Sequence, residues 1–143
     1  MSTEYQQELH KGFDPTRKCN DIRWNCIDYA LSNPDAHCIF EKYLHNFKEN
    51  TVIELFQKTC ALLGIKTKQI QFSDISLHEG NNIIIFYWWE EDTYIDYHFI
   101  RRINGIWFEK IGQNSCPEAF PCGQLDFVIK QYDSDKKSCF IVE

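Results

Sequence analysis

The 143-residue chain has the size of one compact domain, and with 43 % apolar and 25 % charged residues it has the composition of a globular rather than a disordered protein. The net charge is −6, from 21 acidic against 15 basic side chains, and no basic stripe is present, which argues against a nucleic-acid partner. No apolar run approaches the ~18 residues of a membrane span, so we predict no membrane partner either.

The first half of the chain has the apolar spacing of helices. Three segments are expected to be helical: residues 22–33, 35–47 and 51–64. Pro34 ends the first helix, because the residue before a proline disfavours the α-region, and Asp35 is placed as the N-cap of the second. Thr51 and Glu54 form a capping box at the start of the third helix, and Gly64 ends it.

The second half has the β-branched and aromatic composition of strands. Strands are expected at residues 66–72, 82–89, 94–103, 106–111 and 127–131. Asn104-Gly105 is a strong signal for a two-residue hairpin loop. The predicted fold class is α+β, with the N-terminal helices packed on an antiparallel β-meander. We place a single domain at residues 19–132, after a mobile N-terminal segment (1–18) and before a C-terminal tail (133–143).

The hairpin loop fixes which side chains share a face of the sheet. Counting outward from the loop, His98, Glu109 and Trp107 lie on one face, while the opposite face of the same strand is more apolar and should face the core. Glu109 and Gln113 are the two diagonal neighbours of His98. A carboxylate beside an imidazole fixes its tautomer and supports its protonated form. Trp107 is a candidate floor for a substrate groove, with core packing as the alternative.

Cys26 lies near the start of the first predicted helix. The positive end of a helix dipole lowers the pKa of a nearby thiol and favours the nucleophilic thiolate, and an adjacent histidine would complete the activation. Cys26 also fits the apolar face of its own helix, so a buried structural cysteine is the alternative interpretation. His98, likewise, has the alternative of a strand histidine that is satisfied by a neighbouring side chain.

Two short segments resemble the cysteine and histidine boxes of small bacterial papain-fold cysteine hydrolases. They are Asn25-Cys26-x-x-Tyr29-Ala30-Leu31 and Asp96-Tyr97-His98-Phe99-x-Arg101. This clan includes the NlpC/P60 amidases and several secreted effector proteases and glutamine deamidases. The resemblance implies a papain-like fold in which the cysteine attacks an amide carbonyl and the histidine shuttles the proton.

The same resemblance implies two further roles. A third residue, about a dozen positions after the histidine, orients the imidazole; Glu109, eleven residues after His98, occupies that slot, with Gln113 as the alternative. Many relatives carry a histidine there, so Glu109 departs from the common pattern. An upstream amide side chain helps the nucleophile's own N–H to bind the oxyanion. Asn20, six residues before Cys26, is placed for this role, and Asn25 is the substitute.

The seven cysteines include no C-x-x-C pair, which argues against zinc ribbons and thioredoxin-type redox sites. A zinc site from His37, Cys38, His45 and Cys60 is disfavoured by its spacing, so we expect neither metal nor cofactor. The polar start of the sequence lacks the layout of a secretory signal, so we place the thiols in a reducing cytosol. Delivery into a host cell by a signal-independent secretion system is compatible with this placement.

The sequence therefore predicts a thiol hydrolase that acts on an amide of a protein substrate, for which a host protein is one candidate. The reaction is either deamidation of a glutamine side chain or peptide cleavage, and an effector role suits the acidic, thiol-rich chain. The alternative is a non-catalytic acidic interaction or immunity domain that binds one protein partner. That alternative predicts ordinary thiols and no dependence of function on His98.

Overall fold

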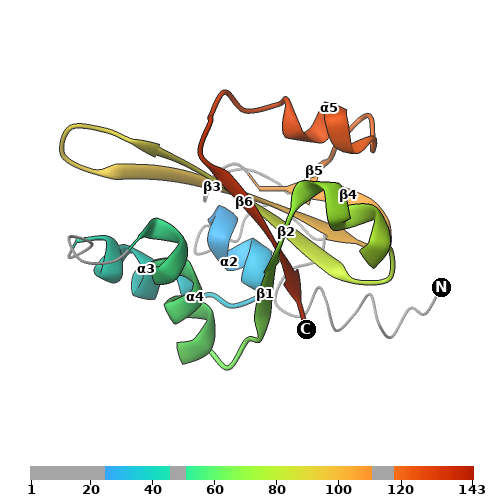
Figure 1. Ribbon diagram of the computed structural model, residues 1–143. Coiled ribbons are helices and arrows are strands. Elements are labelled where there is room, and N and C mark those ends of the chain that lie inside the picture. The colour runs from blue at the N-terminus through green and yellow to red at the C-terminus, as the bar shows by residue number, and fades with distance from the viewer. Residues whose placement is uncertain (1–24, 46–50, 111–117) are drawn as a thin grey trace.

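A six-stranded antiparallel sheet organises the computed structural model, which describes residues 25–45, 51–110 and 118–143. The strand order is β1-β6-β2-β3-β4-β5 (Figure 1). The strands are β1 (Thr67–Ile70), β2 (Asn82–Glu90), β3 (Ile95–Ile103), β4 (Ile106–Glu109), β5 (Glu118–Ala119) and β6 (Lys137–Val142). The helices are α2 (Cys26–Leu31), α3 (Ala36–Leu44), α4 (Val52–Leu62), the 3-10 helix η2 (Phe72–His78) and α5 (Leu125–Ile129). The predicted α+β class is confirmed.

The three predicted helices occur, and local signals define their ends. α2 ends at Leu31, and Ser32 follows in the left-handed conformation with φ 52°. The Thr51 side chain caps α4 by accepting a hydrogen bond from the Glu54 N–H at 3.1 Å, as the capping signal predicts. Asp35 is the N-cap of α3, although its side chain makes no capping hydrogen bond. The parts of the predicted helices at residues 22–24 and 46–50, and the predicted mobile segment 1–18, lie outside the described residues.

The predicted hairpin register is confirmed. Ile103 pairs with Ile106 and Ile100 with Glu109, and the loop residues Asn104 and Gly105 have φ of 52° and 80°. These positive values are what a type I′ turn requires, and they place His98 and Glu109 on one face of the sheet. The outer end of the predicted fourth strand, beyond Lys110, lies outside the described residues.

Two predictions about the end of the chain are wrong. Residues 127–131 were expected to be a strand, but Leu125–Ile129 form α5, because Leu125, Val128 and Ile129 recur at helical spacing and pack into one apolar cluster. Residues 133–143 were expected to be a tail, but β6 lies between β1 and β2 in the sheet. The apolar run in β6 is too short for its periodicity to separate a strand from an irregular segment. The domain therefore includes β6.

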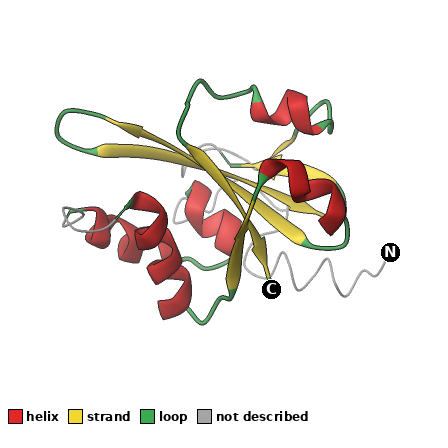
Figure 2. Cartoon of the chain, in the orientation of Figure 1, coloured by secondary structure: helices red, strands yellow, loops and turns green. Residues whose placement is uncertain are grey.

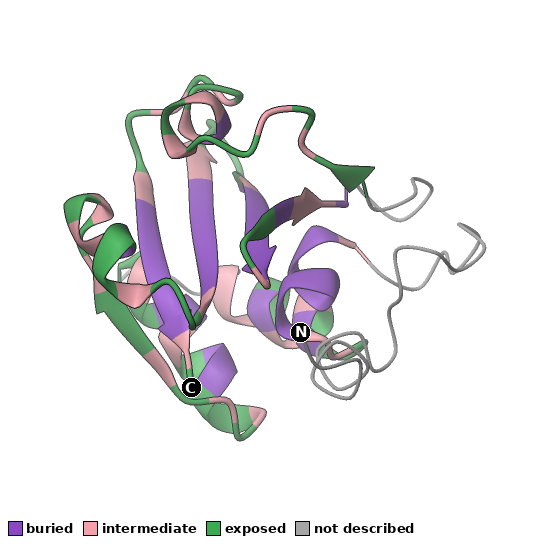
Figure 3. Cartoon of the chain, turned by 90° about the vertical axis from the view of Figure 1, so that its right-hand side faces the viewer, coloured by how far each residue is buried: buried purple, intermediate pink, exposed green. Residues whose placement is uncertain are grey.

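The sheet is covered on both faces (Figure 2), and its central strands are buried (Figure 3). Helices α2, α3 and α4 pack on one face around a cluster of phenylalanines, in which Phe86 and Phe99 stack with ring centroids 4.4 Å apart. This is the apolar face of β3 that was expected to form the core. Helices η2 and α5 cover the other face through Ile75 and Val128. None of the described helices is both long enough and apolar enough to cross a membrane.

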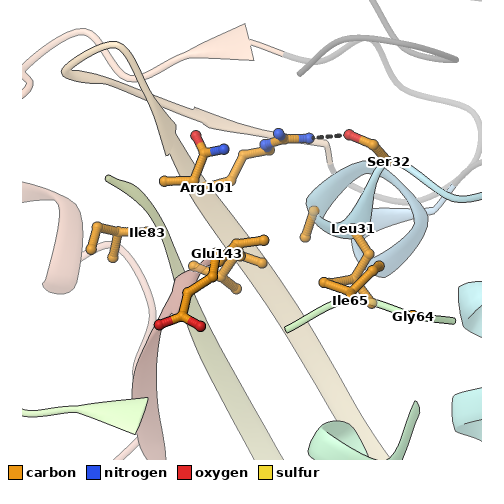
Figure 4. A pocket seen from close by; sticks show the side chains of 11 residues that line it. Leu31, Ser32, Gly64, Ile65, Ile83, Arg101 and Glu143 are labelled. Carbon is orange, nitrogen blue, oxygen red and sulfur yellow. Dashed lines mark hydrogen bonds between the residues drawn. The ribbon is translucent and has the colours of Figure 1, made fainter. Parts of the chain in front are cut away.

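Arg101 joins the C-terminal end of α2 to β3. Its guanidinium is buried and donates hydrogen bonds to the Tyr29 carbonyl at 2.6 Å and to Ser32 Oγ at 2.8 Å. The guanidinium also lies 5.2 Å from the centroid of the Tyr29 ring. Arg101 and Ser32 line a cavity of about 400 Å³, and Figure 4 shows the hydrogen bond between them. The helix that begins at Cys26 is thereby fixed to the strand that carries His98.

Candidate functional site

Cys26 is the first residue of α2, and its position is set by the residue before it. Asn25 is the N-cap, and its Oδ1 accepts hydrogen bonds from the backbone N–H groups of Ile27 at 3.0 Å and Asp28 at 3.2 Å. In return, Asp28 Oδ2 accepts the Asn25 N–H at 3.0 Å, which completes a capping box. This reciprocal pair fixes where the helix begins and therefore where the thiol lies.

The Cys26 thiol is buried and protonated. The residue is 6 % exposed, and Sγ lies 4.0 Å from the carbonyl oxygen of Tyr97. Burial raises the pKa of the Cys26 thiol to about 12, and this outweighs the opposing effect of nearby backbone N–H groups such as that of Phe99. The prediction that the helix start lowers this pKa is therefore wrong, because a helix of six residues cannot offset the desolvation of a buried thiol.

His98 and Glu109 form the predicted pair. Nε2 of His98 lies 2.9 Å from Oε1 of Glu109, and the Tyr132 hydroxyl donates to the same carboxylate oxygen. Burial alone would raise the pKa of Glu109, but hydrogen bonds from His98 and Tyr132, together with the charge of His98, hold that pKa below its usual value. An ionised carboxylate only accepts hydrogen bonds, so Nε2 carries a proton. In the neutral ring, the lone pair of His98 is therefore on Nδ1.

Cys26 and His98 line the same cleft, although they lie on opposite faces of the sheet. The cleft has a volume of about 520 Å³, and Asn25, Trp89 and Tyr132 also line it. Cys26 packs with the helices, whereas the His98 ring contacts Tyr132 on the opposite face. Within the described residues, the pairing of β4 with β3 extends outward from the loop as far as Glu109, opposite Ile100. Within the described residues, the thiol and the imidazole make no hydrogen bond to each other.

No protein-family model and no curated protein matches this chain. In the described ranges, no group of three or more histidine, cysteine, aspartate or glutamate residues converges as metal ligands would. Cys26 and His98 bring a thiol and an imidazole to one cleft. The Glu109 carboxylate is hydrogen-bonded to that imidazole, and Tyr132, which also lines the cleft, contacts both His98 and Glu109.

The remaining predicted site residues have different outcomes. Trp107 is 3 % exposed and packs in the second apolar cluster under the Arg102 guanidinium, so the prediction that it floors a groove is wrong. Trp89 lines the cleft instead. Asn25 lines the cleft, but its side-chain oxygen is committed to capping α2. Asn20 and Gln113 lie outside the described residues.

Among the residues of this cleft that sequence reasoning missed are Tyr132 and Glu41. Tyr132 follows a segment that was expected to be a strand, so no register connected it with His98. Glu41 is exposed on α3 and has no distinguishing motif. A tyrosine beyond the hairpin and one glutamate among many carry no local signal, and only the packing of α3 and α5 places them here.

The burial of the thiols predicts an order of reactivity among the described cysteines. Cys38 is exposed, whereas Cys26 and Cys60 are buried and burial raises the pKa of each to about 12. Iodoacetamide at pH 7, followed by peptide mass spectrometry, should therefore modify Cys38 well before Cys26. Because the thiolate is the reacting form, the Cys26 rate should rise about tenfold per pH unit between pH 7 and pH 10. Equal rates for Cys26 and Cys38 at pH 7 would contradict the burial of the Cys26 thiol and its raised pKa.

Proposed function

We propose that this protein is a papain-like thiol hydrolase of the Cys-His-acid type that acts on an amide bond of a protein substrate. Cys26 is the nucleophile, His98 the general base and then the general acid, and Glu109 the residue that orients the imidazole. The observation that carries the proposal is the 2.9 Å hydrogen bond between His98 and Glu109, in a cleft that Cys26 also lines. A nucleophile and a base that line one cleft, with an orienting group hydrogen-bonded to the base, are the elements of a catalytic triad.

The raised pKa of Cys26 decides how the thiol is used. At pH 7 a pKa of about 12 leaves roughly one thiol in 10⁵ ionised, so the resting site is a neutral thiol and not a thiolate–imidazolium pair. Nδ1 of His98 accepts the proton as sulfur bonds to the substrate carbonyl carbon, which requires the thiol and the imidazole to approach when substrate binds. This is the general-base form of nucleophilic catalysis.

The rest of the reaction returns each group to its starting state. Collapse of the tetrahedral adduct breaks the carbon–nitrogen bond, and His98 gives its proton to the leaving nitrogen as ammonia or as a peptide amine. Water then attacks the thioester and transfers a proton to His98, and the sulfur recovers a proton as the carboxylic acid leaves. The backbone N–H of Cys26, in the first turn of α2, is the proposed main-chain donor to the oxyanion. Asn20 and Asn25 are the proposed side-chain donors.

The charges of the cleft favour a substrate segment that is neutral or cationic. Glu41 and Asp96 line it, and no lysine or arginine of the described chain does so. Tyr97 connects the two acids, since its hydroxyl donates to Glu41 at 3.0 Å and its N–H donates to Asp96 Oδ1 at 2.9 Å. The exposed ring of Tyr94 adds a surface on which a cationic side chain can pack.

Glu41→Gln should therefore weaken turnover of cationic substrates selectively. We expect kcat/KM to fall about three- to tenfold for a glutamine peptide flanked by lysines, the loss of roughly 1 kcal/mol expected for an exposed charge pair. The same peptide flanked by alanines should be unaffected. Glu54→Gln is the matched control, because Glu54 is exposed on α4 and does not line the cleft. An equal loss on both peptides would show that Glu41 acts on structure and not on substrate charge.

A cytosolic protein target, reached by an effector delivered from another cell, remains our proposal for the biological setting. The experiment that tests the activity compares the chain with its Cys26→Ala variant. Unfolded casein is the probe, and released ammonium and new amino termini are measured separately. Ammonium alone indicates deamidation, and new termini indicate proteolysis.

The second candidate function is a non-catalytic acidic interaction or immunity domain. The observation that favours it is the burial of Cys26 without a hydrogen bond to His98 in the described structure. This function predicts that Cys26→Ala and His98→Ala leave the biological effect unchanged. A Cys26-dependent release of ammonium or amino termini would exclude it as the only function.

A further inference from the structure

Two hydrogen bonds hold Tyr132 at the edge of the cleft, one to the chain before this residue and one to the chain after it. It lies between α5 and β6, on the face of the sheet that carries His98. The Tyr87 hydroxyl donates to the Ile129 carbonyl at 2.9 Å, and Trp89 Nε1 donates to the Asp133 carbonyl at 2.6 Å. Both donors belong to β2, so a rigid strand fixes the backbone before and after Tyr132.

From this position Tyr132 contacts both members of the His98–Glu109 pair. Its hydroxyl donates to Oε1 of Glu109, the same oxygen that lies 2.9 Å from Nε2 of His98. Its ring lies against the imidazole, with the two ring centroids 4.4 Å apart and the planes inclined by 35°. The hydroxyl therefore orients the carboxylate, and the ring limits rotation of the imidazole. Tyr132 also lines the cleft that contains Cys26.

These contacts have the chemical effect that an orienting pair needs. A second donor stabilises the ionised form of Glu109, whose pKa lies below its usual value. Burial and the neighbouring carboxylate raise the pKa of Tyr132, so the hydroxyl keeps its proton and remains a donor. Glu109 is thus an acceptor on two sides, and the Nε2 proton of His98 stays in place. The lone pair of Nδ1 is then the one available to the thiol.

We propose that Tyr132 is a positioning residue of the site, whose hydroxyl and ring together hold Glu109 and His98 in the arrangement that leaves Nδ1 of His98 as the base for Cys26. Its part in turnover rests on the proposed hydrolase function, but its effect on the His98–Glu109 pair does not depend on turnover. Tyr132 makes no covalent contribution, and it acts through Glu109 and His98 rather than on the substrate carbonyl.

The test is Tyr132→Phe, with Tyr87→Phe as the matched control. Both variants lose one hydroxyl on the same face of the sheet, but the Tyr87 hydroxyl bonds the Ile129 carbonyl and neither His98 nor Glu109. In Tyr132→Phe, ¹³C NMR should show the pKa of the Glu109 carboxyl rising from its lowered value. ¹⁵N NMR of the imidazole should show a lower share of the Nε2-protonated tautomer of His98. Tyr87→Phe, which loses only the bond that holds the chain before Tyr132, should change both signals less than Tyr132→Phe does.

Turnover supplies the second measurement. Release of ammonium or amino termini from unfolded casein should fall about tenfold in kcat in Tyr132→Phe, with KM changed less than twofold, as for loss of a residue that orients a catalytic group. In a Glu109→Gln background, the same change should cause no further loss, because Tyr132 acts through Glu109. A full tenfold loss in the Glu109→Gln background would show that Tyr132 does not act through Glu109, and it would overturn the inference.

The Glu109 titration and the His98 tautomer test the positioning role of Tyr132 separately from the proposed hydrolase function. If Tyr132→Phe leaves the Glu109 titration and the His98 tautomer as in the parent protein, Tyr132 does not position the pair and the inference is overturned, whatever the activity. If both signals change while casein turnover does not depend on Cys26, the positioning effect is supported and the hydrolase function fails. A thermal melt of each variant identifies any general loss of structure.

Discussion

Cys26→Ala is expected to lower amide hydrolysis by at least about 10³-fold while the protein stays folded. The nucleophile forms the covalent intermediate, so its removal eliminates the proposed pathway and not merely one interaction within it. The structural cost should be small, about 1 kcal/mol, because the change removes a single buried sulfur atom. Ammonium and new amino termini released from unfolded casein measure the activity, and circular dichroism with thermal melting measures the fold.

Cys38→Ala is the control for this prediction, since Cys38 is an exposed cysteine outside the cleft. It should retain the parent rate in full. His98→Ala should resemble Cys26→Ala, because the neutral thiol depends on Nδ1 to remove its proton. Activity that survives in Cys26→Ala, with the fold intact, would disprove the assignment of the nucleophile and leave the interaction domain as the better interpretation.

Arg101→Ala should destabilise the protein by about 3 kcal/mol. Its buried guanidinium donates to the Tyr29 carbonyl at 2.6 Å and to Ser32 Oγ at 2.8 Å. Hydrogen bonds from a charged group contribute about 1.5–3 kcal/mol each, and the variant also leaves buried acceptors without a donor. The free energy of unfolding should be measured by urea denaturation. Loss of this anchor should also lower the proposed activity, because α2 carries Cys26, the proposed nucleophile.

Arg102→Ala is the matched comparison. Arg102 is the next residue of β3, and it is also buried, but it donates to the His78 carbonyl at 2.7 Å on the other face of the sheet. Hydrogen exchange should therefore show faster exchange of α2 amides in Arg101→Ala and faster exchange around η2 in Arg102→Ala. If Arg101→Ala leaves α2 exchange unchanged, its guanidinium does not anchor that helix.

The parts of the site that could be predicted are those governed by local rules. A two-residue loop fixes a hairpin register, and that register placed Glu109 beside His98 from sequence positions alone. Asn25 and Asp28 form a capping box of the same local kind, which would move the expected start of this helix from residue 22 to Cys26. Each of these inferences needs only residues that are close in the chain or joined by a tight turn.

The parts that could not be predicted depend on packing between distant segments. The depth of burial of Cys26 determines its pKa, and that depth is set by contacts of α2 with β3 that no spacing of residues records. Tyr132 reaches His98 only because α5 is a helix that packs on the second face, where the sequence indicated a strand. Trp107 was placed on the correct face, but that face is covered there and not open to a ligand.

The central place of β6 has a consequence for how the protein is made. Residues 137–142 are synthesised after every other described element, and they fill the gap between β1 and β2; Cys139, for example, bonds Ile70, 69 residues earlier. A growing chain that lacks them has two open strand edges and a divided sheet, a state prone to self-association. It already carries the thiol, the imidazole and the carboxylate, but not the framework that aligns them. We therefore expect the proposed site to form only after ribosomal synthesis has passed β6.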